Sequence, residues 1–379
     1  MRSSSLTADA IVVGGGIHGC SAALHLALRG LDVIVIEKDY IARHASGLNA
    51  GGVRRLGRAF PEIPLADAAL KRWCSIRELV DDDCGFESSS QIKVAETETE
   101  LSTLRDRCAA VRSIGFNHEE IIDQKQLRSL LPAIAPHCIG GIFVNGDGHA
   151  NPFKTAMAFK RKAISLGVRI YEHLPVTYVD RFGTNWRATT FNQDFEAPII
   201  INCAGAWGGA IATQVGDNAP LEAQALMLMI TARMPNFVKP VVGSQGRALS
   251  FKQFKNGTVL IGGGYQGRAE PEHNRTHLNF QGLGANAQAA AALFPIMQHS
   301  NIVRCWAGIE GVMPDAIPVI GAGREQGVYH AFGFSGHGFA LAPIVGRIIA
   351  DLISSGRTDL SIKDFNVQRF ENYLFSPGI

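Results

Sequence analysis

Paired cysteines, an excess of charge of one sign and long apolar runs are all missing from this sequence. Its seven cysteines are scattered and form no Cys-x-x-Cys pair, so we expect neither a disulfide framework nor a zinc or iron–sulfur site. The 36 basic and 34 acidic residues nearly balance, which gives no footprint for nucleic acid or an anionic membrane. No stretch supplies the ~18 or more uninterrupted apolar residues that a membrane span needs. These absences favour a protein that acts on a small molecule.

The chain also lacks the marks of an exported or repetitive protein. The opening residues MRSSSLTADA lead straight into a glycine-rich turn, which cannot serve as the apolar core of a signal peptide. With the scattered cysteines, this favours a reducing, cytoplasmic location, where any contact with the inner membrane is made through a partner. No internal repeat or low-complexity linker stands out, and 379 residues with 46% hydrophobic content can form two lobes.

Residues 11–37 carry the first positive signal. They read IVVGGGIHGCSAALHLALRGLDVIVIE: a β-branched run, a Gly-x-Gly-x-x-Gly turn, an alanine- and leucine-rich helix and a second β run ending in Glu37. Gly14 permits the tight turn, Gly16 lets the backbone approach a pyrophosphate, and Gly19 allows close helix packing. The helix N-terminus offers unpaired N–H groups to the anion, and Glu37 is placed to accept hydrogen bonds from a ribose. The segment predicts dinucleotide binding and by itself leaves NAD, NADP and FAD open.

The rest of the chain alternates between two lobes. The glycine-rich, basic stretch 44–58 predicts a loop over the cofactor rather than a regular element. Strands and helices over 86–148, and a strand-rich segment with an alanine-rich helix over 221–299, predict a second lobe. We therefore expect a cofactor domain made of residues 1–85, 149–220 and 300–379, and a substrate domain made of residues 86–148 and 221–299.

Helix boundaries are marked at several points. Asn151-Pro152 is a preferred cap and first-turn pair and predicts a helix that stops at Gly167. A second helix is expected over about 281–294, before Pro295, and the C-terminal helix is expected to end at Gly356.

Four regions together resemble the D-amino-acid-oxidase-like flavoprotein superfamily, in its glycine oxidase and sarcosine oxidase branch. They read VVGGGIHGCSAALHLALRGLDVIVIE (12–37), ASGLNAGGVR (45–54), NCAGAW (202–207), and WAGIEGVMPDAIPVIG with FGFSGHGFALAP (306–321 and 332–343). Within that branch the C-terminal pair is most similar to the B subunits of opine oxidases, and then to the β-subunits of proline and hydroxyproline dehydrogenases. The resemblance implies an α/β fold in which a Rossmann-like FAD domain is interleaved with an α+β substrate domain built on a mixed β-sheet. It implies FAD, with the flavin ring at the junction of the two domains.

The resemblance also assigns cofactor contacts residue by residue. Glu37 would take the adenosine ribose, residues 44–46 and 49–52 would line the pyrophosphate and flavin, and Val176 would meet the adenine. The full set implied is Gly14, Gly16, Ile17, His18, Gly19, Glu37, Lys38, His44, Ala45, Ser46, Asn49, Ala50, Gly51, Gly52, Val176, Ala204, Gly205, Trp207, Gly308, Gly333, Gly336, His337, Gly338 and Phe339.

How the flavin is attached is also implied by the resemblance. Monomeric sarcosine oxidases bind flavin covalently through a cysteine, and the PDAIPVIG segment has none, so noncovalent FAD is expected. Heteromeric sarcosine oxidase β-subunits carry a covalent FMN on a histidine, and His149 in GDGHANP is displaced from that place. A noncovalent FMN at a subunit interface stays open.

The SGHGF loop (335–339) opens a helix, so the backbone N–H groups near Gly336, His337, Gly338 and Phe339 can face the pyrimidine end of the flavin. A positive dipole there would stabilise the negative charge of reduced flavin and raise its reduction potential. The alternative is a plain tight turn in which His337 is a structural histidine.

Three side chains are candidates for contact with substrate. Arg54 and Arg55 follow the NAGG loop, and a guanidinium can hold a carboxylate through two hydrogen bonds; a flavin-phosphate or structural ion pair is the alternative. Tyr265 ends the VLIGGGY strand and could donate a hydrogen bond or form an aromatic wall, or be a core tyrosine.

Glu310 and Ala340 depart from the relatives that this chain resembles. Glu310 stands where glycine-oxidase-like members place a carboxylate-binding arginine, and Ala340 stands where monomeric sarcosine oxidases place a lysine. An acid near the substrate favours a cationic group there, and opines such as nopaline and octopine are secondary amines with a guanidinium arm and carboxylates. The alternative is that Glu310 pairs with Arg304 or Arg324.

These residues lead to a functional expectation. Hydride transfer from the carbon beside the nitrogen to flavin would oxidise the C–N bond of an opine, N-alkyl amino acid or proline, and the imine would then hydrolyse. The catalytic candidates are His337, Glu310, Arg54 and Tyr265, with no metal. The alternatives are a D-amino acid, glycine or sarcosine oxidase that acts alone, or an assembly subunit that is inactive without its partner. The relatives imply a heteromeric partner that carries FAD or iron–sulfur, whereas transfer to tRNA is disfavoured by the near-neutral charge.

Overall fold

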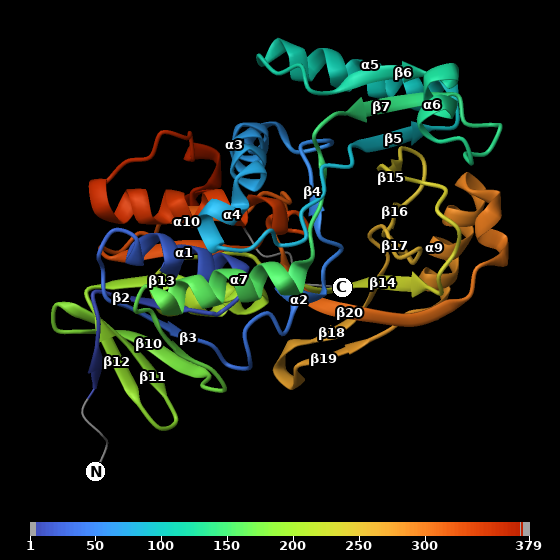
Figure 1. Ribbon diagram of the computed structural model, residues 1–379. Coiled ribbons are helices and arrows are strands. Elements are labelled where there is room, and N and C mark those ends of the chain that lie inside the picture. Colours follow the sequence, from blue (N-terminus) through green and yellow to red (C-terminus); the bar gives the residue numbers. More distant parts are fainter. Residues whose placement is uncertain (1–4, 372, 374–379) are drawn as a thin grey trace.

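A mostly parallel sheet of buried strands forms the centre of the first lobe (Figure 1). The computed structural model describes residues 5–371 and 373. Within that part of the chain, the sheet consists of β21 (Val319–Ala322), β22 (Val328–Phe332), β13 (Ile199–Asn202), β2 (Ala10–Val13), β3 (Val33–Ile36) and β9 (Arg169–Tyr171), in that order, with β21 antiparallel to β22. The strands AIVV, VIVI and IIIN are rich in β-branched residues and are almost wholly buried, as expected for a parallel sheet covered on both faces.

Helices cover one face of this sheet and a small sheet covers the other. Ala10 and Val12 of β2 pack into a core shared with α1 (Ile17–Ala27), α3 (Ile63–Cys74), α7 (Pro152–Ser165) and α10 (Gly338–Ser355). Ile11 and Val13 face the other core, shared with α8 (Gly208–Gln214) and the sheet β1 (Leu6–Thr7), β12 (Asp194–Ala197), β11 (Asn185–Thr190) and β10 (Val176–Phe182). The alternation of side chains along one strand thus builds both layers. α4 (Ile76–Val80) follows α3.

The second lobe is a mixed sheet of ten strands in the described residues. Its order is β19 (Arg275–His277), β18 (Gln266–Glu270), β14 (Glu222–Thr231), β17 (Val259–Gly262), β16 (Ser250–Gln253), β15 (Val241–Ser244), β5 (Gln91–Ala95), β7 (Gly140–Val144) and β6 (Glu120–Asp123), and β20 (Ile302–Val312) also pairs with β14. β15 and β5 are parallel and the other pairs are antiparallel. α9 (Phe280–Leu293) packs on this sheet, and α5 (Glu98–Ser113) and α6 (Gln124–Leu130) flank β5, β6 and β7.

The strand pairing differs from the predicted domain boundaries at one end. β20 begins at residue 302, inside the segment 300–379 assigned to the cofactor domain, and pairs along its length with β14 of the second lobe. The reason is a long-range pairing across about 80 residues that no local pattern encodes. Residues 1–4, 372 and 374–379 of the predicted cofactor domain lie outside the described residues.

Most predicted elements are confirmed, and one loop is corrected. The α7 helix starts at Pro152 with the Asn151 side chain accepting from Lys154 N–H at 2.9 Å, and α10 ends at Gly356 with φ 71°. The stretch 44–58 is not wholly irregular as predicted: it holds α2 (Ala45–Leu48) and β4 (Gly52–Val53). The short β4 forms because it pairs with β8 (Gly148–His149).

The C-terminal helix α10 is the one helix in the described residues with the length and composition of a membrane span, and 67% of that stretch is buried inside the protein. It lies against α1, where the Ser21 hydroxyl donates to the Ala342 carbonyl at 2.7 Å and Gly346 leaves no room for a Cβ beside Ser21. Its apolar character is explained by this packing.

Candidate active site

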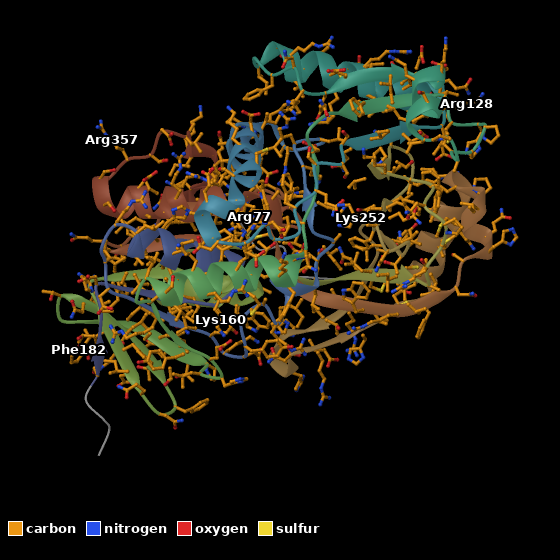
Figure 2. The ribbon with its side chains drawn as sticks, in the orientation of Figure 1. Arg77, Arg128, Lys160, Phe182, Lys252 and Arg357 are labelled. Atoms are coloured by element: carbon orange, nitrogen blue, oxygen red, sulfur yellow. The ribbon has the colours of Figure 1, made fainter. Side chains whose placement is uncertain are left out.

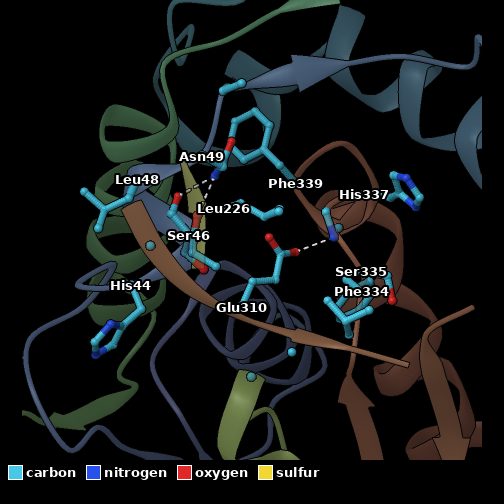
Figure 3. A pocket seen from close by; sticks show the side chains of 18 of the residues that line it. His44, Ser46, Leu48, Asn49, Leu226, Glu310, Phe334, Ser335, His337 and Phe339 are labelled. Carbon is cyan, nitrogen blue, oxygen red and sulfur yellow. Dashed lines mark hydrogen bonds between the residues drawn. The ribbon is translucent and has the colours of Figure 1, made fainter. Parts of the chain in front are cut away.

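A cavity of about 780 Å³ lies where the two lobes meet, within the range expected for a cofactor or substrate site (Figure 3). All of the predicted cofactor-binding residues except Gly19 line it, and so do Arg54, Glu310 and His337. Tyr265 does not line it: its side chain is partly exposed, and Gly264 and Gln266 on either side line the cavity instead. Whether each lining residue contacts the cofactor stays a prediction.

The glycine turn brings three backbone segments into close contact. Gly14 has φ 102°, and a Cβ there would collide with the carbonyl group of Cys203 at the end of β13. Gly19 faces the Gly14 carbonyl, so its lack of a side chain lets α1 start directly against the turn. Gly16 faces Ser46, and a Cβ added at Gly16 would lie 2.9 Å from the Ser46 hydroxyl oxygen.

Glu37 directly follows β3, and each of its carboxylate oxygens accepts a backbone hydrogen bond. Gly15 N–H donates to Oε2 at 2.6 Å and Asp39 N–H donates to Oε1 at 2.8 Å. Burial raises the pKa of Glu37, and these two hydrogen bonds oppose that rise. Each oxygen keeps a second lone pair, which leaves room for a ribose hydroxyl.

Beside Glu37, aromatic and cationic side chains close the same end of the cavity. Lys38 Nζ lies 3.4 Å from the ring centroid of Trp207, and His44 Nε2 lies 3.2 Å from Asp39 Oδ2. Burial lowers the pKa of His44 to about 4, so the imidazole is neutral at neutral pH.

The loop before β4 holds itself against the start of α1. Ile17 N–H donates to the Ser46 hydroxyl at 2.9 Å, so Ser46 stands at the N-terminus of the cofactor helix. Asn49 fixes the loop: its Nδ2 donates to the Ala45 and Ser46 carbonyls at 2.8 and 3.0 Å, and its Oδ1 accepts from Gly51 N–H at 2.6 Å (Figure 3). A bound anion would find a hydroxyl and helix N–H groups here.

His18 supplies a test of whether the cavity fits a cofactor. Its ring stacks on Phe334 with centroids 3.6 Å apart, and both ring nitrogens are buried without a hydrogen-bond partner among the described residues. Burial lowers the pKa of His18 to about 3, against a smaller opposing effect of the nearby Gly338 backbone, so the ring is neutral. An unsatisfied buried polar group is costly unless a bound molecule satisfies it, so His18 fits a cavity built to hold a polar cofactor.

The SGHGF loop connects β22 to α10, and Glu310 of β20 is bonded to it. Gly336 N–H donates to Glu310 Oε1 at 2.6 Å (Figure 3). His337 N–H donates to the Phe334 carbonyl at 2.9 Å. The prediction that all four loop N–H groups face the flavin is therefore corrected at Gly336 and His337, because both already donate within the chain. Gly338 and Phe339 open α10 and have no acceptor in that helix.

Glu310 does not pair with Arg304 or Arg324, the structural alternative. Arg324 pairs with Glu371 at 2.6 Å, and the Arg304 guanidinium lies over the Trp306 ring. Burial raises the pKa of Glu310 to about 7, and the Gly336 N–H opposes that rise. The cavity therefore holds an acid that changes charge near neutral pH.

The two adjacent arginines have different roles. Arg55 is a structural ion-pair residue, since its guanidinium lies 3.2 Å from both Asp147 and Asp67 and donates to the Asn145 carbonyl at 2.7 Å. Arg54 lines the cavity and donates to the Leu56 carbonyl. Burial lowers the pKa of Arg54 to about 10, which leaves it charged at neutral pH.

A buried ion pair that the sequence analysis missed lies under the same loop. Arg58 and Glu62 are fully buried, with Nη1 and Oε1 3.4 Å apart. Arg58 also donates to the carbonyls of Arg54 at 3.1 Å and His337 at 2.9 Å, and so joins two cavity-lining segments 279 residues apart. Burial and the nearby arginines lower the pKa of His337 to about 3, and its Nδ1 lies 4.0 Å from Glu62 Oε2. The Arg-x-x-x-Glu spacing was the available signal.

Lys252 was also missed. It lies on β16 in the interior of the protein, whereas Arg128 and Arg357 lie at the periphery (Figure 2), and its ammonium group donates to the Ala50 carbonyl in the loop before β4. Burial lowers the pKa of Lys252 to about 7. A lysine in a strand of alternating pattern gives no local sign that it is buried.

A parallel sheet with a glycine turn at its carboxyl edge, a buried acid after the next strand and a large cavity between the lobes define a dinucleotide-binding protein. A family model described as FAD dependent oxidoreductase, DAO, matches residues 9–352. The chain belongs to this family, and its cofactor is FAD. None of the comparisons supports the FMN that the sequence left open.

Several relatives match nearly the whole chain. It is 25% identical to glycine oxidase from Geobacillus kaustophilus, covering 95% of this chain and 97% of that protein, and 25% identical to an opine oxidase subunit from Rhizobium meliloti, covering 96% and 98%. The crystal structure of L-proline dehydrogenase from P. horikoshii matches with a TM-score of 0.89 and 25% identity, over 97% of this chain and 99% of that one. The chain spans 42% of the length of human mitochondrial sarcosine dehydrogenase, to which it is 24% identical.

Proposed function

We propose that this protein oxidises the C–N bond of a secondary-amine amino acid, of the kind represented by opines, N-alkyl amino acids and proline. The observation that carries the proposal is that an acid and a base line one cavity, with Glu310 on β20 and Arg54 after β4. A guanidinium can hold a substrate carboxylate through two hydrogen bonds, and a carboxylate can hold a cationic nitrogen. Amine-oxidising relatives of similar length support the same reaction class.

The bound flavin supplies a hydride acceptor, and this chain's own residues prepare the amine for it. Arg54 fixes one end of the substrate, which orients the carbon next to nitrogen. Glu310 is anionic above about pH 7 and attracts a cationic group of the substrate. Loss of hydride from carbon and of a proton from nitrogen leaves an imine, and water then converts the imine into an amine and a carbonyl compound.

Anaerobic reduction of the FAD-loaded protein tests this reaction. N-methyl amino acids, proline, nopaline and octopine are added in turn, with any partner subunits present, and the oxidised flavin absorbance is followed. We expect bleaching by at least one secondary amine and none by the corresponding carboxylic acid without nitrogen. Absence of bleaching by all of them and by D-amino acids would sink the proposal.

A second candidate is an oxidase of glycine, sarcosine or D-amino acids that acts alone. It is favoured by the match over nearly its full length to glycine oxidase, a relative named for that activity. Oxygen consumption by the purified single chain with these substrates separates the two candidates.

The electron acceptor is proposed to be a partner subunit in the cytoplasm. Two relatives, one from an opine oxidase and one from a sarcosine oxidase, are named as subunits of their enzymes, which supports a heteromeric arrangement. Any contact with the membrane would be made through that partner. If turnover with the co-purified neighbouring gene products equals turnover of the chain alone, the partner has no role in electron transfer.

A further inference from the structure

The end of the cavity around Arg54 holds more positive than negative charge. Three of the cations nearby have carboxylate partners: Arg55 pairs with Asp147, Arg58 with Glu62, and Arg107 with Glu119. Two further cations line the cavity itself, Arg54 and Lys93, and in residues 5–371 and 373 neither has a carboxylate within 4 Å.

Lys93 is directed into the cavity by the alternation of β5. Ile92 and Val94 are fully buried in the core of the second lobe, so Gln91 and Lys93 lie on the opposite face of the strand, and both line the cavity. In the adjacent strand β15, Gly243 stands in register with Lys93, so no side chain covers the lysine on that side. On the other side Ile142 of β7 stands in register with Lys93, so the lysine lines the cavity beside the glycine.

Gln91 adds an unused polar atom on the same face. Its Oε1 is buried without a hydrogen-bond partner in the described part of the chain. Since the two ends of an amide can exchange by rotation, either an acceptor or a donor can be presented there. The face of β5 toward the cavity is thus polar and unsatisfied.

Arg54 and Lys93 influence each other although they come from different elements. Burial lowers the pKa of Lys93, the neighbouring charges of Arg107 and Arg54 lower it further, and the more weakly acting Glu119 carboxylate opposes them. Two half-buried cations that face one cavity, with no carboxylate within 4 Å among the described residues, are costly, and an anion bound between or beside them lowers that cost.

We infer that Arg54 and Lys93 form a two-cation subsite that selects secondary amines with two carboxylates over those with one. Lys93 is the specificity-determining residue, because it takes the second carboxylate while Arg54 takes the first. The inference rests on the proposed function for the amine, whereas the second carboxylate follows from the two cations that line the cavity.

The FAD pyrophosphate is the other anion that could use these cations. It is expected at the turn between β2 and α1, where Ser46 and the helix N–H groups stand, whereas Lys93 belongs to the sheet of the second lobe. The effect of replacing Lys93 on FAD affinity therefore separates a substrate site from a pyrophosphate site.

The test compares iminodiacetate with its monoamide, which keeps size and nitrogen and removes one charge. Binding to the FAD-loaded protein is measured from the change in the oxidised flavin spectrum, which needs no turnover. The variants are Lys93→Met, Lys93→Arg and, as a matched control, Lys125→Met on the exposed face of α6. FAD content and melting temperature are recorded for each.

The native protein is expected to bind the diacid about tenfold or more tightly than the monoamide, as for a charged hydrogen bond. Lys93→Met should remove this preference by weakening the diacid alone, whereas Lys93→Arg and Lys125→Met should keep it, and FAD affinity should not change. Equal binding of diacid and monoamide to the native protein overturns the inference, and so does loss of FAD affinity in Lys93→Met. Failure of any amine to bleach the flavin is a separate result that contradicts the proposed reaction instead.

Discussion

The carboxylate of Glu310 accepts the backbone N–H of Gly336 at 2.6 Å, so an acid occupies a donor of the very loop that opens α10. The two residues lie on strand β20 of the second lobe and on the SGHGF loop of the first. Because the acid and the loop sit together in the cavity, the charge of Glu310 is coupled to the electrostatics around the flavin and to the charge of the substrate.

Removing the charge of Glu310 is expected to make the flavin easier to reduce. In Glu310→Gln the midpoint potential should rise by tens of millivolts at pH 8, because an anion beside the electron acceptor is lost. Since the pKa of Glu310 is raised to about 7, the acid is neutral at lower pH, and the difference from native protein should shrink below pH 7. Spectroelectrochemical titration at several pH values measures this. Glu272→Gln, an exposed control, should match native protein, and a pH-independent difference would contradict the account.

Substitutions at two glycines with positive φ distinguish the effect of a steric collision from the effect of backbone strain. Gly14→Ala should abolish stable FAD binding, because a Cβ at Gly14 collides with the Cys203 carbonyl group. Gly30→Ala has a similar φ of 83° and no atom within 4 Å, so it should cost only about 1–2 kcal/mol and keep FAD. Cofactor content after gel filtration and thermal unfolding of both variants decide. Equal loss in both would mean that strain alone explains Gly14.

Two histidines of α1 give opposite expectations. His18→Leu should stabilise the FAD-free protein by about 1–3 kcal/mol, because it removes buried nitrogens without partners, and should weaken FAD binding. His25→Leu should destabilise the same form, since His25 Nε2 lies 3.1 Å from the Pro343 carbonyl. Urea unfolding of the FAD-free form and equilibrium FAD titration measure both effects. Unchanged FAD affinity in His18→Leu would exclude His18 from the cofactor site.

The buried pair under the SGHGF loop is expected to be essential for stability. Glu62→Gln leaves Arg58 buried without a counterion and should lower the free energy of unfolding by about 3–5 kcal/mol. Since Arg58 holds the carbonyls of Arg54 and His337, FAD affinity should fall as well. Arg77→Gln breaks the exposed pair with Asp83 and should stay within about 1 kcal/mol. Chemical denaturation compares them, and a Glu62→Gln as stable as Arg77→Gln would contradict the role assigned to the pair.

The sequence was sufficient for features encoded by neighbouring residues. The β2–α1–β3 unit follows from β-branched runs around a glycine turn, and α7 follows from its Asn151-Pro152 start. These signals act within a few residues, so no tertiary information is needed.

Features that join distant segments could not be predicted. Arg58 reaches His337 across 279 residues, and the pairing of β20 with β14 places Glu310 beside Gly336. Tyr265 was predicted to reach the site and does not line the cavity. The position of a residue at a strand end does not determine to which face of the sheet its side chain points.

Anaerobic stopped-flow reduction with a secondary-amine amino acid deuterated at the carbon beside nitrogen tests whether this protein transfers hydride from that carbon to the flavin. We expect flavin bleaching that slows several-fold on deuteration, with one carbonyl product per flavin reduced and release of the corresponding amine. A flavin that stays oxidised with bound substrate, or bleaching without a carbonyl product, would contradict it.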